Sequence, residues 1–249
     1  MYFYSLTVMV EKIEGIVLRT LKYNDSLLIA DIYTAQRGRM SFLVPVSHSK
    51  RSKVRSVLFQ PLSMLSFTAT VKSGRNLSRI GEVQPLSMYS SIPNNVVKSS
   101  IALFLAELLT FALREGGKDE SLYTFLDRSF TLFDNLECGY ADFHLVFMVQ
   151  LLRYLGIYPN IDGFVNGCYF DLAQGCVVRE HPLHPSFLLP ADAILFVELL
   201  RTGYDSMHLL SLNRKLRGGY LATLSLYYRL HIPEFPELRS AAVLRELFD

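Results

Sequence analysis

The first 85 residues carry hydrophobic positions at the two-residue spacing of β-strands. In the clearest segment, "SMLSFTATVK", every second residue from Leu65 to Val71 is apolar and the residues between them are Ser or Thr, the pattern of a strand with one buried face. Four more runs, "KIEGIVLRT", "LLIADIYT", "RMSFLVPV" and "LSRIGEVQP", are separated by turn signals such as "KYNDS" and "SGRN". Because five short strands in about 75 residues fit a small closed barrel, we predict a five-stranded OB-fold barrel.

After the linker "QPLSMYSSIPNN" the apolar spacing changes to that of α-helices. The first helical stripe comprises Ile101, Leu105, Leu108, Leu109 and Ala112, preceded by Asn94 or Asn95 as N-cap. Further helices are predicted at roughly 119–135, 140–155, 190–202 and 212–230. The segment at about 156–190 is too rich in Gly, Pro and Asn for a helix.

These patterns predict an α+β chain of two domains. The OB-fold barrel is expected over residues 1–85, and an all-helical C-terminal domain over residues 86–249. The segment at about 156–190 is expected to be an irregular, metal-free part of the second domain.

Electric charge is distributed unevenly between these two regions. Residues 1–85 contain 12 Lys+Arg and 5 Asp+Glu, a net charge of +7, whereas residues 86–249 contain 13 and 18, a net charge of −5. The basic residues gather in three segments: Arg37 and Arg39; Lys50, Arg51, Lys53 and Arg55; and Lys72, Arg75 and Arg79. Such an excess favours a polyanionic partner, although the same charges also suit the solvated surface of a small β domain.

Several features of the sequence bear on the compartment. The longest apolar stretch, Ile101 to Leu113, contains Glu107 and is shorter than the ~20 residues that span a bilayer. The N-terminal segment lacks the basic region and cleavage site of a signal peptide. The three cysteines have irregular spacing and form no disulfide framework. We therefore expect a cytoplasmic protein with reduced thiols and no membrane contact.

The sequence contains no Walker-type phosphate loop and no GxSxG, HExxH or GxGxxG motif. One group of potential zinc ligands stands out: Cys168, Cys176, His181 and His184. Structural zinc sites usually present their ligands in close pairs, whereas seven residues separate these two cysteines. We therefore expect no metal, no cofactor and no enzymatic activity, and keep as an alternative an enzyme that uses His181 or His184 of this segment.

Several stretches resemble the RecO family of bacterial recombination mediators. The region from Glu14 to Pro45, "EGIVLRTLKYNDSLLIADIYTAQRGRMSFLVP", is similar to the N-terminal region of that family. "LFLAELLTFALRE" is similar to its first long helix, "LLRYLGIYPNIDG" to its Leu-Gly-x-x-Pro segment and "PELRSAAVLREL" to its C-terminal end. Many members carry two zinc-binding Cys-x-x-Cys pairs, but here Phe164 and Gly167 stand where the first pair belongs and Cys176 is alone at the second. The zinc role of the family is therefore not transferred to this chain.

The resemblance implies a DNA repair and recombination mediator. It would bind single- and double-stranded DNA without sequence preference, anneal complementary strands, and assist recombinase loading with RecR and without nucleotide hydrolysis. The helical region would dock proteins, among them the C-terminal tail of single-stranded DNA-binding protein. A scaffold whose basic barrel binds an acidic protein remains an alternative.

In an OB-fold the binding surface is the face of strands 2 and 3 with its flanking loops. We expect phosphate contacts from the three basic segments, Arg37 and Arg39, Lys50 to Arg55, and Lys72 to Arg79. Base stacking is expected from Tyr23, Tyr33 or Phe42, although Phe42 also fits an inward-facing position.

Overall fold

The computed structural model describes residues 8–45, 56–72, 77–114, 117–210 and 212–247. The chain divides into two compact units, Met1–Asp134 and Asn135–Asp249. Each is described by itself.

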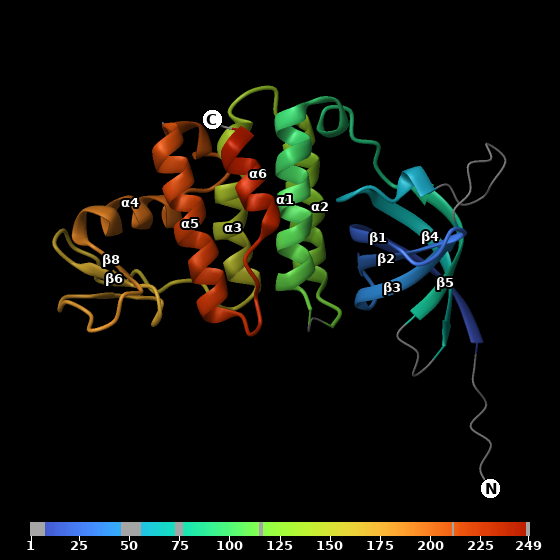
Figure 1. Ribbon diagram of the computed structural model, residues 1–249, viewed down its shortest axis with the longest axis horizontal. Helices are drawn as coiled ribbons and strands as arrows, with labels where there is room; N and C mark the ends of the chain where they lie inside the picture. Colours follow the sequence, from blue (N-terminus) through green and yellow to red (C-terminus); the bar gives the residue numbers. More distant parts are fainter. Residues whose placement is uncertain (1–7, 46–55, 73–76, 115–116, 211, 248–249) are drawn as a thin grey trace, which may run out of the picture. The chain divides into compact units, whose positions relative to one another are not determined.

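The first unit begins with a closed five-stranded barrel, in blue to cyan-green in Figure 1. Its strands are β1 (Val8–Lys22), β2 (Leu27–Thr34), β3 (Gly38–Pro45), β4 (Met64–Lys72) and β5 (Leu77–Pro85). They follow the order β1-β2-β3-β5-β4, with β1 closing onto β4; β3 and β5 run parallel and the other neighbours antiparallel. The predicted OB-type barrel is confirmed.

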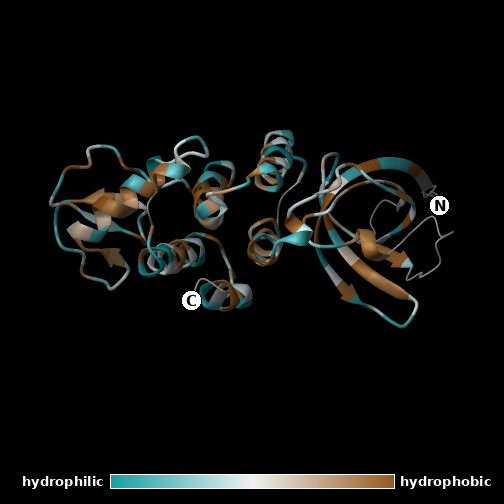
Figure 2. Cartoon of the chain, turned by 90° about the horizontal axis from the view of Figure 1, so that it is seen from above, coloured by the Kyte–Doolittle hydropathy of each residue, from teal (hydrophilic) through white to brown (hydrophobic). Residues whose placement is uncertain are grey.

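Alternation along the strands builds the barrel core. The barrel strands carry runs of hydrophobic residues interrupted by hydrophilic ones (Figure 2). Leu65, Phe67 and Ala69 face inward as predicted, and the Phe67 ring meets the Phe42 ring edge to face with centroids 5.0 Å apart. Gly15 allows β1 to lie close to β2, because a Cβ at this position would lie 2.5 Å from the Cγ2 atom of Ile32.

Two α-helices follow the barrel in the part of the first unit that the structure describes. They are α1 (Val96–Ala112) and α2 (Glu120–Asn135), and short 3₁₀ turns precede β4 (η1, Ser56–Leu58) and α1 (η2, Ile92–Asn94). Asn95 is the N-cap of α1, since its side chain accepts hydrogen bonds from the backbone N–H groups of Val97 and Lys98. The predicted domain boundary after residue 85 coincides with the end of β5. The compact unit itself continues to Asp134, because α1 packs against β1.

In its described residues, the second unit contains four longer helices and a small sheet. The helices are α3 (Phe143–Tyr154), α4 (Pro190–Arg201), α5 (Arg214–His231) and α6 (Arg239–Leu247), with 3₁₀ turns η3 (Tyr140–Asp142) and η4 (Met207–Leu209). The strands β6 (Tyr169–Asp171), β7 (Cys176–Val178) and β8 (Phe187–Leu188) form a sheet in the order β7-β6-β8. Within the described ranges, no helix combines the length and apolar character needed to cross a bilayer.

Two expectations for this unit need correction. The segment at 156–190 is non-helical as predicted, but it forms an antiparallel three-stranded sheet, so the C-terminal region is not all-helical. Helix α6 was not predicted, because its nine residues have a short apolar stripe next to charged positions.

Candidate nucleic-acid interface

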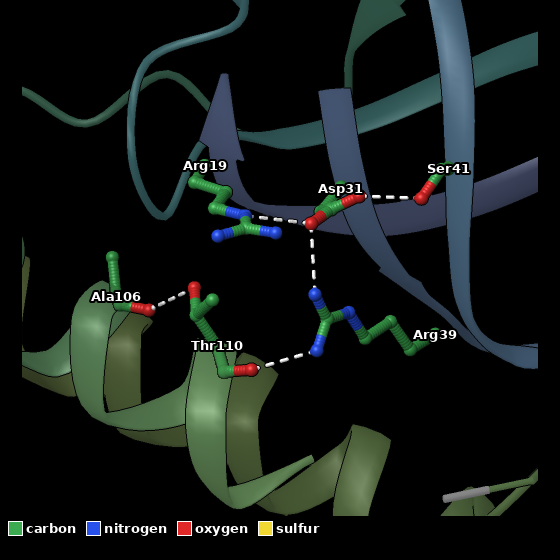
Figure 3. A network of polar contacts seen from close by, with 6 residues as sticks. All are labelled: Arg19, Asp31, Arg39, Ser41, Ala106 and Thr110. Atoms are coloured by element: carbon green, nitrogen blue, oxygen red, sulfur yellow. Dashed lines mark hydrogen bonds and ion pairs between the residues drawn. The ribbon is translucent and has the colours of Figure 1, made fainter. Parts of the chain in front are cut away.

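The outer surface of β2 and β3, with the loops that flank it, was expected to bind nucleic acid, and this surface continues onto the neighbouring C-terminal half of β1. In this structure α1 lies over part of it, and we call it the covered face (Figure 3). Arg19, Asp31 and Ser41 are direct cross-strand neighbours there, because the β1–β2 and β2–β3 registers align them in one row. The three side chains point out of the barrel, since Ala30 and Ile32 on either side of Asp31 point into the core.

Asp31 is the centre of a polar network on the covered face. Its Oδ2 atom accepts hydrogen bonds from Arg19 Nε at 2.7 Å and from Arg39 Nη2 at 2.8 Å, and its Oδ1 atom accepts one from the Ser41 hydroxyl. Burial by itself raises the pKa of Asp31, but the hydrogen bonds from Ser41, Arg19 and Arg39 outweigh it and lower the pKa. Asp31, only 4% exposed, is therefore an anion at neutral pH.

Arg39 connects this network to α1. Its Nη1 atom donates a hydrogen bond of 2.7 Å to the backbone carbonyl of Thr110, in the last turn of α1 (Figure 3). A cation at this end of a helix also interacts favourably with the helix dipole. The Arg39 side chain is 15% exposed and bonds both α1 and Asp31 of β2. It therefore fixes α1 on the barrel. Its predicted contact with nucleic acid stays a prediction.

The predicted base-stacking residues lie in different environments. Phe42 is in the barrel core and Tyr33 is buried on the covered face, both 0% exposed. Burial and the nearby charge of Asp119, just before α2, raise the pKa of Tyr33 to about 12. This corrects the expectation for Tyr33, whereas Phe42 occupies the inward-facing position that was its alternative; neither ring presents a face to a base. Tyr23 lies in the turn between β1 and β2 and is 60% exposed, so its ring is accessible for stacking on a base.

The outer surface of the N-terminal half of β1, β4 and β5, which we call the open face, carries exposed basic side chains. Val10, Thr70 and Arg79 form one row across the three strands, and Lys12 lies opposite Thr68 in the next outward-facing row. Lys12 and Arg79 are both exposed. Lys12 and Arg79 are one outward-facing row apart along the strands, about 6.6 Å, and two strands apart across the sheet, about 9.6 Å. The two cations therefore lie on the same face of the barrel.

The other predicted cations are placed as follows. Arg37 is exposed and pairs with Glu11, with Nη2 to Oε1 at 2.6 Å and Nε to Oε2 at 3.1 Å. Lys50, Arg51, Lys53, Arg55 and Arg75 lie outside the described residues, as does the side chain of Lys72. In the chain, residues 73–76 connect β4 to β5, both strands of the open face. Lys12 was not predicted as a DNA contact, because the nearby Glu11 and Glu14 leave no excess of positive charge in this stretch of the sequence.

The potential zinc ligands of the second unit are not brought together. Among the residues that the structure describes, no three His, Cys, Asp or Glu side chains form a group that could hold a metal ion. Cys168 is buried, and His184 Nε2 lies 3.0 Å from Asp171 Oδ2. The His181 ring packs edge-on against Phe187 with centroids 4.7 Å apart. The expected absence of zinc stays a prediction.

Comparison with known proteins covers nearly the whole chain. The family model "Recombination protein O N terminal" matches residues 9–89, and "Recombination protein O C terminal" matches residues 93–240. The chain is 45% identical over 240 residues to the DNA repair protein RecO of Phocaeicola vulgatus, covering 96% of this chain and 100% of that protein. It is 37% identical over 240 residues to the DNA repair protein RecO of Porphyromonas gingivalis, covering 94% and 98%. This chain therefore belongs to the RecO family.

Proposed function

We propose that this chain acts in DNA repair and homologous recombination by binding DNA through the open face of its barrel. The observation that carries the proposal is the placement of Lys12 and Arg79 on exposed strands of a barrel with net charge +7 over residues 1–85. On the covered face, Arg19 and Arg39 pair with Asp31 instead. The name of the relatives, DNA repair protein RecO, supports the same role.

Binding of this kind does not select a sequence. Lys and Arg side chains contact phosphates, which are the same at every nucleotide, and the released counterions make the affinity depend on salt. Tyr23 adds a ring on which any base can stack. Single- and double-stranded DNA are both expected to bind, because the phosphate contacts are common to both.

The mediator activity and its partners are part of the proposal. The chain anneals complementary strands, binds RecR and the C-terminal tail of single-stranded DNA-binding protein, and assists recombinase loading without hydrolysing a nucleotide. It acts in the bacterial cytoplasm, on the nucleoid. Annealing of complementary oligonucleotides, bare or coated with single-stranded DNA-binding protein, tests this activity; failure with both substrates contradicts it.

Oligonucleotide binding at several salt concentrations tests the open face. The double variant Lys12→Glu/Arg79→Glu should bind all mixed-sequence oligonucleotides more weakly, with the slope of log affinity against log salt flatter by about 1.4 for single strands. Charge reversal of Lys50, Arg51, Lys53 and Arg55 together should act in the same direction. The matched control is Arg179→Glu/Arg229→Glu, which reverses two exposed charges of the second unit.

Unchanged affinity and salt slope in both barrel variants would refute the proposed surface. If the unmodified chain itself shows no salt-dependent binding of oligonucleotides, the scaffold alternative, in which the basic barrel binds an acidic protein, takes its place.

A further inference from the structure

The first unit contains a groove beside α1 that the proposed function does not use, and we call it the apolar groove. It has a volume of about 460 Å³, and its wall comprises η1, the start of β4, the linker after β5, η2 and one side of α1. Charged residues make up 19% of the chain, yet none of the 16 described residues that line the groove is charged. Because no side chain here could pair with a buried charge, the groove fits an uncharged, apolar surface.

Large hydrophobic side chains project at the same place. Val57, Met88 and Leu103 line the groove, and Val96 lies two turns before Leu103 on the same helix. These four side chains are between 53% and 84% exposed. Single exposed hydrophobic residues are common, whereas several together mark an interaction surface. This surface therefore combines a hollow with projections.

The combination favours a second copy of the chain as the occupant. In a two-fold symmetric contact the same surface is present on both partners, so the projections of each copy must fill the hollow of the other. The apolar groove meets both requirements. A bound peptide would fill the hollow, but it would not require Met88, the most exposed of the four side chains, to project beside it.

The charges around the groove also permit a contact between two copies. Residues 1–134 contain 16 Lys+Arg and 11 Asp+Glu, a net charge of +5, so two copies repel each other wherever basic residues meet. The apolar groove avoids this repulsion because its lining is uncharged. A neighbouring hollow of about 310 Å³ has one charge of each sign among its described lining residues, Arg19 and Glu107. The whole contact region is therefore electrically balanced.

The size of this region matches that of a stable dimer interface. The groove and the neighbouring hollow meet at Pro61 and Leu103, which line both. Sixteen residues line the groove and nine line the hollow. The combined surface therefore lies within the ~20–30 residues that each partner contributes to a standard interface.

The position of Leu103 indicates how two copies can be arranged. This residue lies near the middle of α1 (Val96–Ala112). If two α1 helices pack antiparallel with the two-fold axis at this residue, Leu103 contacts its own copy, and Ser99 of one helix lies opposite Glu107 of the other. This register brings no like charges of the two helices together.

We propose that the apolar groove is the interface of a homodimer, in which two α1 helices pack antiparallel about Leu103 and Met88 of each copy enters the groove of the other. The interface includes neither Lys12 nor Arg79. The dimer therefore carries two open faces, and two DNA strands held on one particle meet at a high effective concentration. Only this last consequence rests on the proposed function.

The mass of the full chain in solution tests the dimer. Light scattering during size-exclusion chromatography should give a mass that approaches twice the 28.4 kDa of one chain as the protein concentration rises through the micromolar range. In Met88→Glu/Leu103→Glu the dissociation constant of the dimer should rise about 100-fold or more, because each copy would bury two charges in an apolar interface. The matched control Val165→Glu/Leu209→Glu changes two exposed hydrophobic residues of the second unit and should dimerise normally.

Crosslinking tests the antiparallel arrangement of the helices. In a Cys138→Ser/Cys176→Ser background, which removes the two cysteines that are not buried, Leu103→Cys should form a covalent dimer with a short bismaleimide. Ser99→Cys and Glu107→Cys should each crosslink poorly alone and well when the two proteins are mixed. Efficient crosslinking of each single variant, without a gain on mixing, would contradict the antiparallel register.

Two results would overturn the proposal. One is a single-chain mass at every concentration, which would leave the groove to a segment of another protein. The other is a dimer whose dissociation constant does not change in Met88→Glu/Leu103→Glu. If this variant misfolds by circular dichroism, Met88→Gln/Leu103→Gln replaces it. The mass is measured without DNA, and Lys12→Glu/Arg79→Glu should keep the dimer mass, so failure of the dimer and failure of the proposed function are distinguishable.

Discussion

On the covered face of the barrel, Arg19 and Arg39 share the carboxylate of Asp31, whereas on the open face Lys12 and Arg79 extend into solvent. The same residue type therefore has two roles in one small barrel. Arg39 fixes α1 to the barrel, because it donates hydrogen bonds to Asp31 and to the Thr110 carbonyl within the same chain. Lys12 and Arg79 are available to partners outside the chain. The difference is set by Asp31, which pairs with both guanidinium groups of the covered face, and by α1, whose Thr110 carbonyl accepts a further hydrogen bond from Arg39.

Removal of the shared carboxylate should produce the largest effect. Asp31→Ala leaves two guanidinium groups without their anion, one of them mostly buried, and should destabilise the chain by about 3 kcal/mol, the lower end for a broken buried pair. Urea denaturation followed by circular dichroism measures this. The control Asp25→Ala removes a carboxylate that is 98% exposed and pairs with Lys22, and should leave the midpoint unchanged. Equal midpoints for the two variants would show that the network on the covered face is not structural.

Acid should weaken the same network to a smaller extent. The pKa of Asp31 is lower in the folded chain than its ordinary value of 3.8, so its contribution to stability is complete above that value and is lost as the pH falls through the folded pKa. Stability measured from pH 6 to pH 2.5 should decline below about pH 4. In Asp31→Ala the decline should be shallower, and Asp134, whose pKa is also lowered, contributes to the part that remains. Identical acid dependence in both proteins would contradict this assignment.

Loss of the exposed ring should have an intermediate effect on binding. Tyr23→Ala removes a stacking platform worth about 1–3 kcal/mol per base, so single-strand affinity should fall about fivefold or more while stability stays the same. Tyr23→Phe keeps the ring and should bind normally. If the Ala variant binds as well as the Phe variant, no base stacks at this position.

Release of Arg37 should have the smallest effect. Glu11→Gln removes the carboxylate that holds this guanidinium, and oligonucleotide affinity should rise slightly, by less than about 1 kcal/mol, since the pair is partly exposed. Glu180→Gln in the second unit makes the same charge change at an exposed position. An equal rise in both variants would mean that only net charge matters.

The fold could largely be predicted from sequence because its signals are local. Alternation at Leu65, Phe67 and Ala69 and the helical stripe from Ile101 to Ala112 depend only on neighbours in the chain, and both are confirmed. The small sheet at residues 169–188 was missed because its strands are two or three residues long, too short for a period to appear.

The site was harder to predict because its geometry depends on distant contacts. Arg39 bonds a carbonyl 71 residues away, and no pattern around "QRGRM" signals that contact. Tyr33 occupies an outward-facing position in the alternating pattern of β2, as a surface residue would, yet it is buried. Which outward face of a barrel is open is decided by the helix that packs on it, and that information lies in another part of the sequence.

The two halves of β1 have different partners, and this matters during synthesis. Gly15 to Lys22 pair with β2, which follows at once in the chain, whereas Val8 to Ile16 pair with β4, whose last residue is Lys72. During synthesis the first half of β1 therefore has no strand partner until β4 has left the ribosome. This half of β1 contains three charged residues, Glu11, Lys12 and Glu14. Charged residues on an exposed strand edge discourage pairing with another chain. We therefore expect these three charges, of which Lys12 also belongs to the proposed DNA surface, to hinder aggregation of the nascent barrel.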